Sequence, residues 1–348
     1  MKIVKTINLP LDKFINWSLY NKNFGYYIKK NPFDNKSDFI TAPKISRLFS
    51  EILAIWTITF WRSIGSPKKF NLIELGAGDG EMMKILIETL KNFPEFFNSC
   101  KFIIHEKSNK LISIQKRNIN CNKVSWIKDI KKLNSSPTIF LANEFFDAIP
   151  VKQFFKKGRE WFERYVDLKD LKNAKFINQK TNIKKLEKDL NFKISKKQNV
   201  IEYSPEAFRY LKYICEFIQN NDGGMLIIDY GYLGSKMYET LQAINNHKYS
   251  KVLENIGNSD ITYNISFNLF KKFIKKFNNV KTILTNQKKF LTNMGIIKRA
   301  EIISKNQPFL KKADIFYRIK RLLDEKEMGE LFKVMLIKNK KNKFKTGF

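Results

Sequence analysis

Residues 72–80 read Leu-Ile-Glu-Leu-Gly-Ala-Gly-Asp-Gly, and this stretch decides the fold. A short apolar run with one acid precedes three glycines on alternate positions, and a helix-forming segment begins at Glu81. The pattern predicts a strand, a tight turn and a helix, because glycine tolerates positive φ and lets a ligand approach the backbone. Such a turn brings a ligand to the free N–H groups of a helix N-terminus.

The spacing of the glycines distinguishes between ligands. A dinucleotide-binding turn has the pattern G-x-G-x-x-G, whose third glycine packs the helix against the strand. Counted from Gly76, that third position is Glu81, a bulky anion that would repel a pyrophosphate. An acid before Gly76, Gly78 and Gly80 instead resembles the first motif of class I S-adenosylmethionine (SAM)-dependent methyltransferases. SAM is cationic and has no phosphate, so Glu74 would be favourable near its amine, directly or through a water. Taken alone, the motif fits another nucleotide-binding or a structural turn equally well.

Two further apolar runs suggest neighbouring strands with polar groups at their ends. Residues 101–106 end in Glu106, which we expect at the carboxyl edge of the sheet, where doubly wound folds bind ligands. This carboxylate could accept both ribose hydroxyl protons, or it could be a surface acid. Residues 124–127 predict a third strand, in which Trp126 could flank an adenine ring and after which Asp129 could accept the adenine amino group. Core packing or a solvated loop would explain Trp126 and Asp129 equally well.

The fourth expected strand, 138–142, runs into Asn-Glu-Phe-Phe-Asp-Ala-Ile-Pro at residues 143–150. Glu144 and Asp147 are three residues apart, which would place both on one side of a helical turn. The position corresponds to the substrate side of a doubly wound sheet. In the alternative interpretation Asn143 is a cap and the two acids are merely solvated.

Residues 143–150 are similar to the Asn-Glu-Phe-Phe-Asp-Ala-Leu-Pro signature of one methyltransferase family. That family includes the mitochondrial complex I assembly factor and its bacterial relatives, described as protein arginine methyltransferases. Further matching blocks occur in the family's order: Gly25–Tyr27, Asp38–Pro43, Ile45-Ser46, Phe49, Glu51, Glu106–Ser108, Leu111, Gln115, Val151, Gln153-Phe154, Trp161, Glu163-Arg164, Asp229–Gly231, Thr240–Ala243, His247, Gln287, Phe290-Leu291, Gly295-Ile296, Met328-Gly329 and Leu331–Val334. Departures include Lys44, where an acid is usual, and residues 260–267, which lack a histidine and an acid of the family.

The resemblance implies an α/β fold with a doubly wound, seven-stranded sheet of the class I methyltransferase type, its last strand antiparallel. The expected strands lie near 72–75, 102–106, 124–127, 138–142, 225–229, 279–284 and 331–338. We expect a helical N-terminal and lid segment over 1–68 and the methyltransferase core over 69–348. The core would carry an insertion at about 151–222, with a β-hairpin around Gly158 and an exposed lysine-rich stretch at 181–197. A second insertion, at about 286–330, would be mostly helical.

The expected chemistry follows from the methyl donor. Arginine is a poor nucleophile, because its guanidinium is protonated and delocalised. An enzyme that methylates it needs carboxylates that hold the guanidinium by paired hydrogen bonds. Glu144 and Asp147 are our catalytic candidates, with Asn143 orienting the loop, and Asp38 and Asp229 are second choices.

The methyl donor is SAM, and no metal site is expected. The predicted cofactor-binding residues, including two from the lid segment, are Glu74, Gly76, Gly78, Gly80, Glu106, Asp129, Asp38 and Thr41.

The resemblance also implies a protein substrate, the 49-kDa-type subunit of respiratory complex I during its assembly, and a possible homodimer. Two alternatives stay open, namely a methyltransferase of RNA or a small molecule, and an assembly chaperone that binds SAM without catalysis. An adenine-N6 methyltransferase would have Asn/Asp-Pro-Pro-aromatic after the fourth strand, and residues 143–146 lack both prolines.

The composition limits the partners and the compartment. The net charge of +32 comes almost entirely from scattered lysines, which fits the coding bias of an AT-rich genome and solvated surfaces. Without an aromatic stacking platform or a known module, we expect no nucleic-acid partner. The three cysteines lack metal-ligand spacing and suggest a reducing compartment. No apolar run is long enough to span a bilayer and no signal peptide is evident, so we expect a bacterial cytoplasmic protein.

Overall fold

The computed structural model describes residues 8–29, 41–171, 173–245 and 248–348. Its contacts divide the chain into two compact units. Unit 1 comprises residues 1–39, 146–210 and 233–273, and unit 2 comprises residues 40–145, 211–232 and 274–348. The domain boundary expected after residue 68 stays a prediction, and Asp38 lies outside the described residues.

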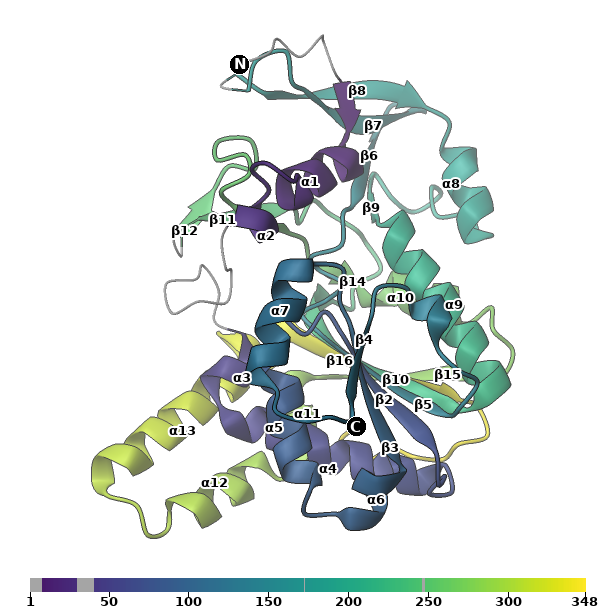
Figure 1. Ribbon diagram of the computed structural model, residues 1–348. Coiled ribbons are helices and arrows are strands. Elements are labelled where there is room, and N and C mark those ends of the chain that lie inside the picture. Colours follow the sequence, from purple (N-terminus) through teal and green to yellow (C-terminus); the bar gives the residue numbers. More distant parts are fainter. Residues whose placement is uncertain (1–7, 30–40, 172, 246–247) are drawn as a thin grey trace. The chain divides into compact units, whose positions relative to one another are not determined.

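Unit 2 is built on a mixed sheet (Figure 1). Its strands are β2 (Phe70–Leu75), β3 (Cys100–His105), β4 (Val124–Ile127), β5 (Thr138–Asn143), β10 (Gly223–Tyr232), β15 (Val280–Asn286) and β16 (Phe332–Asn339). They follow the order β15-β16-β10-β5-β2-β3-β4. The pairs among β10, β5, β2, β3 and β4 are parallel, whereas β16 is antiparallel to both of its neighbours. Each expected strand is present, and the predicted α/β class with an antiparallel last strand is confirmed.

Helices cover both faces of this sheet. The helices of unit 2 are α3 (Ala42–Ile45), α4 (Arg47–Ser63), α5 (Glu81–Leu90), α6 (Pro94–Ser99), α7 (Asn109–Asn118), the 3-10 turn η1 (Ile130–Lys132), α9 (Pro205–Asn221), α11 (Gln287–Asn293), α12 (Ile296–Ser304), α13 (Phe309–Leu323) and α14 (Met328–Leu331), of which α4, α5 and α9 pack on the sheet as follows. On one face, α9 sets Phe217 edge-on against Phe140 of β5, with ring centroids 5.6 Å apart. Helices α4 and α5 pack on the other face, so the sheet is doubly wound. Residues 286–330 are mostly helical, as expected.

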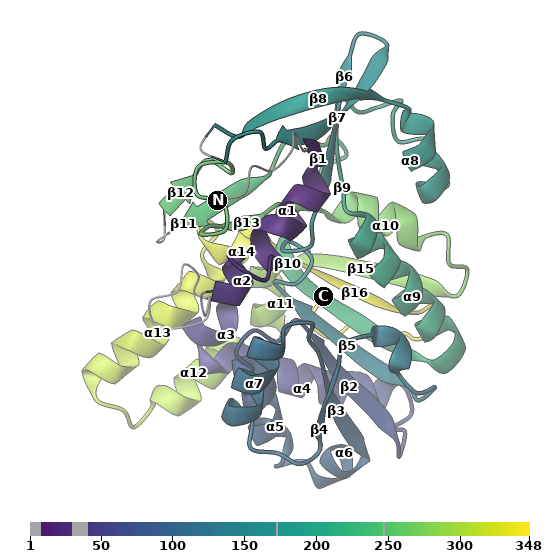
Figure 2. The same ribbon diagram turned by 45° about the horizontal axis from the view of Figure 1, so that its top comes forward.

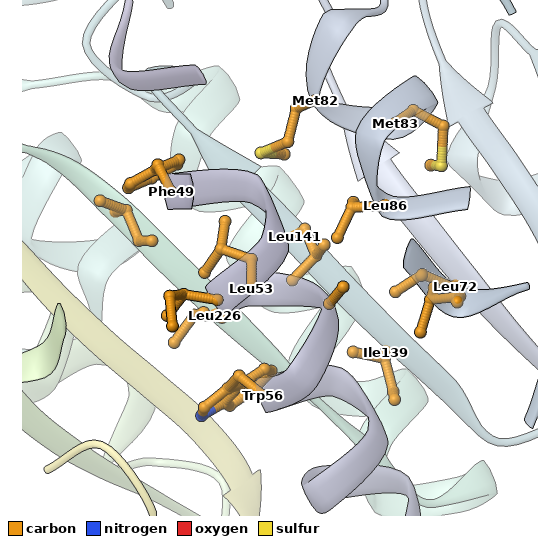
Figure 3. Close-up of a cluster of buried hydrophobic side chains, with 14 of the residues drawn as sticks. Phe49, Leu53, Trp56, Leu72, Met82, Met83, Leu86, Ile139, Leu141 and Leu226 are labelled. Atoms are coloured by element: carbon orange, nitrogen blue, oxygen red, sulfur yellow. The ribbon is translucent and has the colours of Figure 1, made fainter. Parts of the chain in front are cut away.

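The core under α4 follows from the alternation of side chains along the strands. Leu72, Ile139 and Leu141 point to the α4 side of the sheet, where they meet Leu53 and Trp56 of α4 (Figure 3). The hydroxyl oxygen of Ser46 accepts a hydrogen bond from the Leu48 N–H at 3.3 Å, and this N-cap starts the helix. The apolar face of α4 is therefore buried against the sheet. No helix in the described part of the chain combines the length and apolar character that a bilayer span requires.

Unit 1 contains smaller sheets and helices. Its elements are β1 (Asn8–Pro10), α1 (Leu11–Tyr20), α2 (Tyr26–Lys29), β6 (Lys152–Lys157), β7 (Glu160–Asp167), β8 (Lys175–Thr181), α8 (Ile183–Leu190), β9 (Val200–Tyr203), β11 (Gln242–Asn245), β12 (Lys248–Ser250), β13 (Asp260–Thr262), β14 (Ile265–Ser266) and α10 (Phe267–Ile274). Strands β6 and β7 form the expected hairpin around Gly158. The stretch 181–197 is less exposed than expected, because α8 buries Ile183, Leu186 and Leu190 on one face while its lysines face solvent.

We predict that Leu141→Ala lowers the free energy of unfolding by about 2–5 kcal/mol, because Leu141 lies in the core under α4. Urea denaturation followed by tryptophan fluorescence measures the loss. The matched control is Leu310→Ala, whose side chain is exposed and whose loss should change stability by less than about 0.5 kcal/mol. Equal losses in the two variants would contradict the core assignment.

Candidate functional site

The glycine turn adopts backbone conformations that other residues rarely reach. Gly76, Gly78 and Gly80 have φ angles of +68°, +56° and +89°. The Gly76 N–H donates to the carbonyl oxygen of His105 at 3.0 Å. A Cβ atom added at Gly76 would lie 2.7 Å from the ring of Phe145, so no side chain fits there. The turn therefore keeps an open backbone between β2 and the first residue of α5, as the sequence predicts.

Glu74 is buried in β2, two residues before the turn, with 3% of its surface exposed. Burial raises the pKa of its carboxyl to about 8, and the nearby Asp79 raises it further. Its Oε2 atom is buried without a hydrogen-bond partner in the described part of the chain. A cationic ligand group such as the SAM amine would supply that partner, so this residue fits the expected methyl donor.

The buried amide of Gln115, on α7, joins three parts of the predicted cofactor site. Its Nε2 donates to the carbonyl oxygen of Gly78 at 2.8 Å and to Oε2 of Glu106 at 3.4 Å. Its Oε1 accepts from the Trp126 indole N–H at 3.0 Å. Gln115 is among the residues that match the family pattern, but the pattern alone gave it no role. A signal was available, because Gln115 is a polar residue on the apolar face of α7, beside Leu111.

Glu106 follows β3 and is almost fully buried. Its Oε1 accepts from the backbone N–H of Ser108 at 2.8 Å, and burial raises the pKa of its carboxyl. Asp129, in contrast, is exposed, and its Oδ1 accepts from the Lys131 N–H at 3.0 Å, which caps η1. The ribose role of Glu106 and the adenine role of Asp129 stay predictions.

The segment after β5 differs from the expected helical turn, and that prediction is wrong. Asn143 ends the strand, and Glu144 has φ +51°, in the left-handed region that non-glycine residues rarely occupy. The Glu144 N–H donates to the Ile228 carbonyl oxygen at 2.9 Å, and the Phe145 N–H donates to Oδ2 of Asp229 at 3.2 Å. A right-handed helical turn requires a negative φ at each of its residues, so the left-handed Glu144 is incompatible with one here.

The Glu144 side chain is held at the start of α3. Its Oε1 accepts from the backbone N–H of Ala42 and from Nδ2 of Asn143, each at 3.1 Å. Burial raises the pKa of Glu144 to about 7, although both hydrogen bonds lower it. Thr41 is the N-cap residue of α3, directly before Ala42. Asn143, Glu144 and Thr41 thus lie together in unit 2.

Lys44 of α3, one of the departures from the family pattern, has a partner. Its Nζ lies 2.8 Å from Oδ2 of Asp79, and both side chains are mostly buried. The ion pair connects α3 to the glycine turn.

Asp147 belongs to unit 1, whereas Asn143 and Glu144 belong to unit 2. The Asp147 side chain is buried, and its carbonyl oxygen accepts from the Tyr263 N–H at 3.3 Å. In the same unit the Tyr27 hydroxyl donates to the carboxylate of Asp260, at 3.1 and 3.2 Å. The second catalytic candidate is therefore anchored in the other unit of the chain.

Residues 52–285 match the family described as "Putative S-adenosyl-L-methionine-dependent methyltransferase". The chain is 27% identical to "Protein arginine methyltransferase NDUFAF7, mitochondrial" of Xenopus tropicalis, over 95% of this chain and 83% of that protein. The protein of the same name from Homo sapiens is also 27% identical, over 95% of this chain and 80% of that one.

A crystal structure from Burkholderia thailandensis with bound S-adenosyl-homocysteine has the same fold. Its TM-score is 0.77 at 23% identity, with 95% of this chain and 88% of that one covered. A native crystal structure from the same organism gives a TM-score of 0.79 at 21% identity, over 98% of this chain and 89% of that one.

We predict that Gly76→Ala weakens binding of S-adenosyl-homocysteine, the ligand of the Burkholderia structure. The new Cβ would displace the Phe145 ring and strain the turn. We expect a loss of about 1.4 kcal/mol in binding free energy, which is about a tenfold rise in Kd. Isothermal titration calorimetry measures it. Gly65→Ala is the control, because Gly65 also has positive φ but its added Cβ meets no atom within 4 Å. Equal affinity in both variants would argue against the turn as the ligand site.

We predict that Gln115→Met weakens S-adenosyl-homocysteine binding and changes Trp126 fluorescence. The substitution removes the hydrogen bonds that the Gln115 side-chain amide forms with Gly78 and Trp126. Each lost hydrogen bond costs about 1 kcal/mol. Gln287→Met serves as control, since Gln287 is equally buried and donates to the Leu322 carbonyl oxygen at 3.0 Å. The control should lose stability and keep its affinity. If Gln115→Met loses stability but keeps its affinity, the prediction is contradicted and Gln115 has only a structural role.

Proposed function

We propose an arginine side chain of a protein as the methyl acceptor of this chain, which belongs to the family of S-adenosyl-L-methionine-dependent methyltransferases. The family match covers residues 52–285, so the chain is a methyltransferase and SAM is its methyl donor. The arginine acceptor is supported by the names of the relatives from Xenopus tropicalis and Homo sapiens. It is supported also by the chemistry of Glu144.

In this proposal, SAM is held by the open turn and the acids around it. Glu74 would face the SAM amine, because its buried Oε2 lacks a partner in the described chain. The glycines Gly76, Gly78 and Gly80 would offer backbone without side chains. Glu106 would accept the ribose hydroxyl protons, and Asp129 and Thr41 would bound the site. Bound SAM supplies a methyl group that its sulfonium has already activated.

The observation that carries the acceptor proposal is the state of Glu144. A buried carboxyl with a pKa of about 7 is poised to lose its proton near neutral pH. Once ionised, it can accept the N–H groups of a guanidinium and stabilise positive charge on the reacting nitrogen. The positive φ of Glu144 stores backbone strain of the kind that clusters at functional sites.

The neighbours of Glu144 would position it. Asn143 donates to Oε1 of Glu144, and Asp229 holds the next residue through the Phe145 N–H. Asp229, a second choice as a guanidinium ligand, is better explained as a positioning residue, because it accepts from two backbone N–H groups. Asp147 and Asp38 remain proposed as further carboxylates for the substrate.

The proposed protein substrate is the 49-kDa-type subunit of respiratory complex I, as the family resemblance implies. A homodimer and a bacterial cytoplasmic location are proposed on the same resemblance and on the cysteine content and composition. The relatives from Xenopus tropicalis and Homo sapiens are named as mitochondrial proteins.

We predict that Glu144→Gln lowers methyl transfer to the purified complex I subunit by about 10²- to 10³-fold. Below pH 7 the wild-type carboxyl is protonated and cannot bind a cation, so the wild-type rate should rise with pH through about 7. This limb of the profile should be absent in Glu144→Gln. Labelled SAM with mass-spectrometric mapping of methylated residues measures both effects.

Glu88→Gln is the control, because Glu88 is a partly exposed glutamate of the same unit whose carboxylate pairs with Arg47 at 2.8 Å and has no proposed role in the site. Both variants should bind S-adenosyl-homocysteine as the wild type does. If Glu144→Gln methylates the subunit at the wild-type rate, the arginine proposal loses its chemical basis. If the protein methylates RNA or a small molecule and leaves the subunit unmodified, that molecule and not a protein arginine is the methyl acceptor.

A further inference from the structure

Helices α12 and α13 of unit 2 pack against each other and extend away from the sheet (Figures 1 and 2). Large apolar side chains are exposed along this hairpin, including Phe309 at 81%, Leu310 at 80%, Tyr317 at 63% and Ile302 at 59%. Phe309 and Leu310 begin α13, at the turn between the two helices. Large apolar side chains that stay exposed close to one another mark binding surfaces, because water solvates them poorly.

Lysines surround the exposed apolar residues. Lys305 directly follows α12, and Lys311 and Lys312 directly follow Leu310. None of these three lysines forms an ion pair within the described residues, although Arg318 further along α13 pairs with Asp314 at 2.8 Å. The turn of the hairpin therefore combines an apolar tip with uncompensated positive charge.

We propose that this hairpin tip docks on an anionic phospholipid bilayer. Phe309 and Leu310 would enter the boundary between headgroups and acyl chains. Lys305 and Lys311 would extend to the lipid phosphates while their aliphatic stems stay beside the apolar residues. Anionic headgroups attract each basic residue near the surface, so the two contributions act together.

The charge balance favours this partner over a second copy of the chain. Two copies of the tip would each bring Lys305, Lys311 and Lys312 into the contact, so the tips would repel each other at close approach. A bilayer offers negative charge at its surface and an apolar layer below it, which matches both features of the tip. Docking is independent of the methyl acceptor and does not rest on the arginine proposal.

The test is co-sedimentation of the full chain with vesicles at low salt. One vesicle contains phosphatidylcholine alone, and the other contains roughly one third phosphatidylglycerol. Wild type should bind the anionic vesicle at least about tenfold more strongly than the neutral one. Phe309→Ser/Leu310→Ser and Lys305→Glu/Lys311→Glu should each weaken anionic binding about tenfold or more.

Matched controls separate the tip from the general surface. Tyr249→Ser removes an aromatic that is 79% exposed elsewhere in the chain. Lys271→Glu/Lys272→Glu makes the same change of net charge on the exposed face of α10. Both controls should bind anionic vesicles within about twofold of the wild type if the tip is the docking site. All variants should keep the wild-type affinity for S-adenosyl-homocysteine, which shows that unit 2 is folded.

Two results would overturn the proposal. If Lys271→Glu/Lys272→Glu reduces binding as strongly as the tip variants do, the attraction belongs to the whole basic surface. Light scattering after size exclusion tests the other partner. A wild-type dimer that Phe309→Ser/Leu310→Ser converts to a monomer, with vesicle binding unchanged, would assign the tip to contact between copies.

Discussion

The close approach of the Phe145 ring to Gly76 is the constraint on which the rest of the site depends. A Cβ at Gly76 would lie 2.7 Å from that ring, so the turn after β2 must be bare backbone. Phe145 is held in turn by the hydrogen bond that its backbone N–H donates to Asp229. The preceding residue, Glu144, has a positive φ. The open turn and the strained glutamate are therefore two consequences of the same packing between β2, β5 and β10.

Burial gives the acids of unit 2 their chemical character. The carboxyls of Glu74, Glu106 and Glu144 all have raised pKa values, with burial as the largest cause in each. No lysine or arginine forms an ion pair with Glu74, Glu106 or Glu144 in the described chain, and Lys44 is paired with Asp79 instead. Partly neutral carboxyls that lack an ion-pair partner suit cationic ligands, because a cationic ligand supplies the opposite charge that these groups do not find within the described chain. The methyl donor and the proposed guanidinium acceptor are both cations.

Particular residues show how far sequence reasoning reached. The glycine turn, the strands and the β6–β7 hairpin follow from local signals, namely glycine spacing, apolar runs and alternation, and these predictions are confirmed. The predicted helical turn over Glu144 and Asp147 was wrong, because the spacing of two acids does not reveal the positive φ that Glu144 adopts in the folded chain. Gln115 received no role, since its three partners come from a turn, a strand end and a neighbouring strand that only folding brings together. The exposure of Phe309 and Leu310 does not follow from the expectation of a mostly helical insertion at about 286–330 either.

The sequence by itself determined the α/β class with its antiparallel last strand and, through the resemblance, the methyltransferase family and its methyl donor. It could do so because glycine spacing and apolar periodicity are local properties of the chain, and because many matching blocks occur in the family's order. The tertiary structure alone decided which side chains share an environment. It brought the Glu144 carboxyl within hydrogen-bonding distance of the Ala42 N–H and Gln115 together with its three partners, and it assigned Asp147 to unit 1. Hydrogen bonds between distant segments and the desolvation that shifts a pKa arise only when those segments pack, so no reading of the linear pattern contains them.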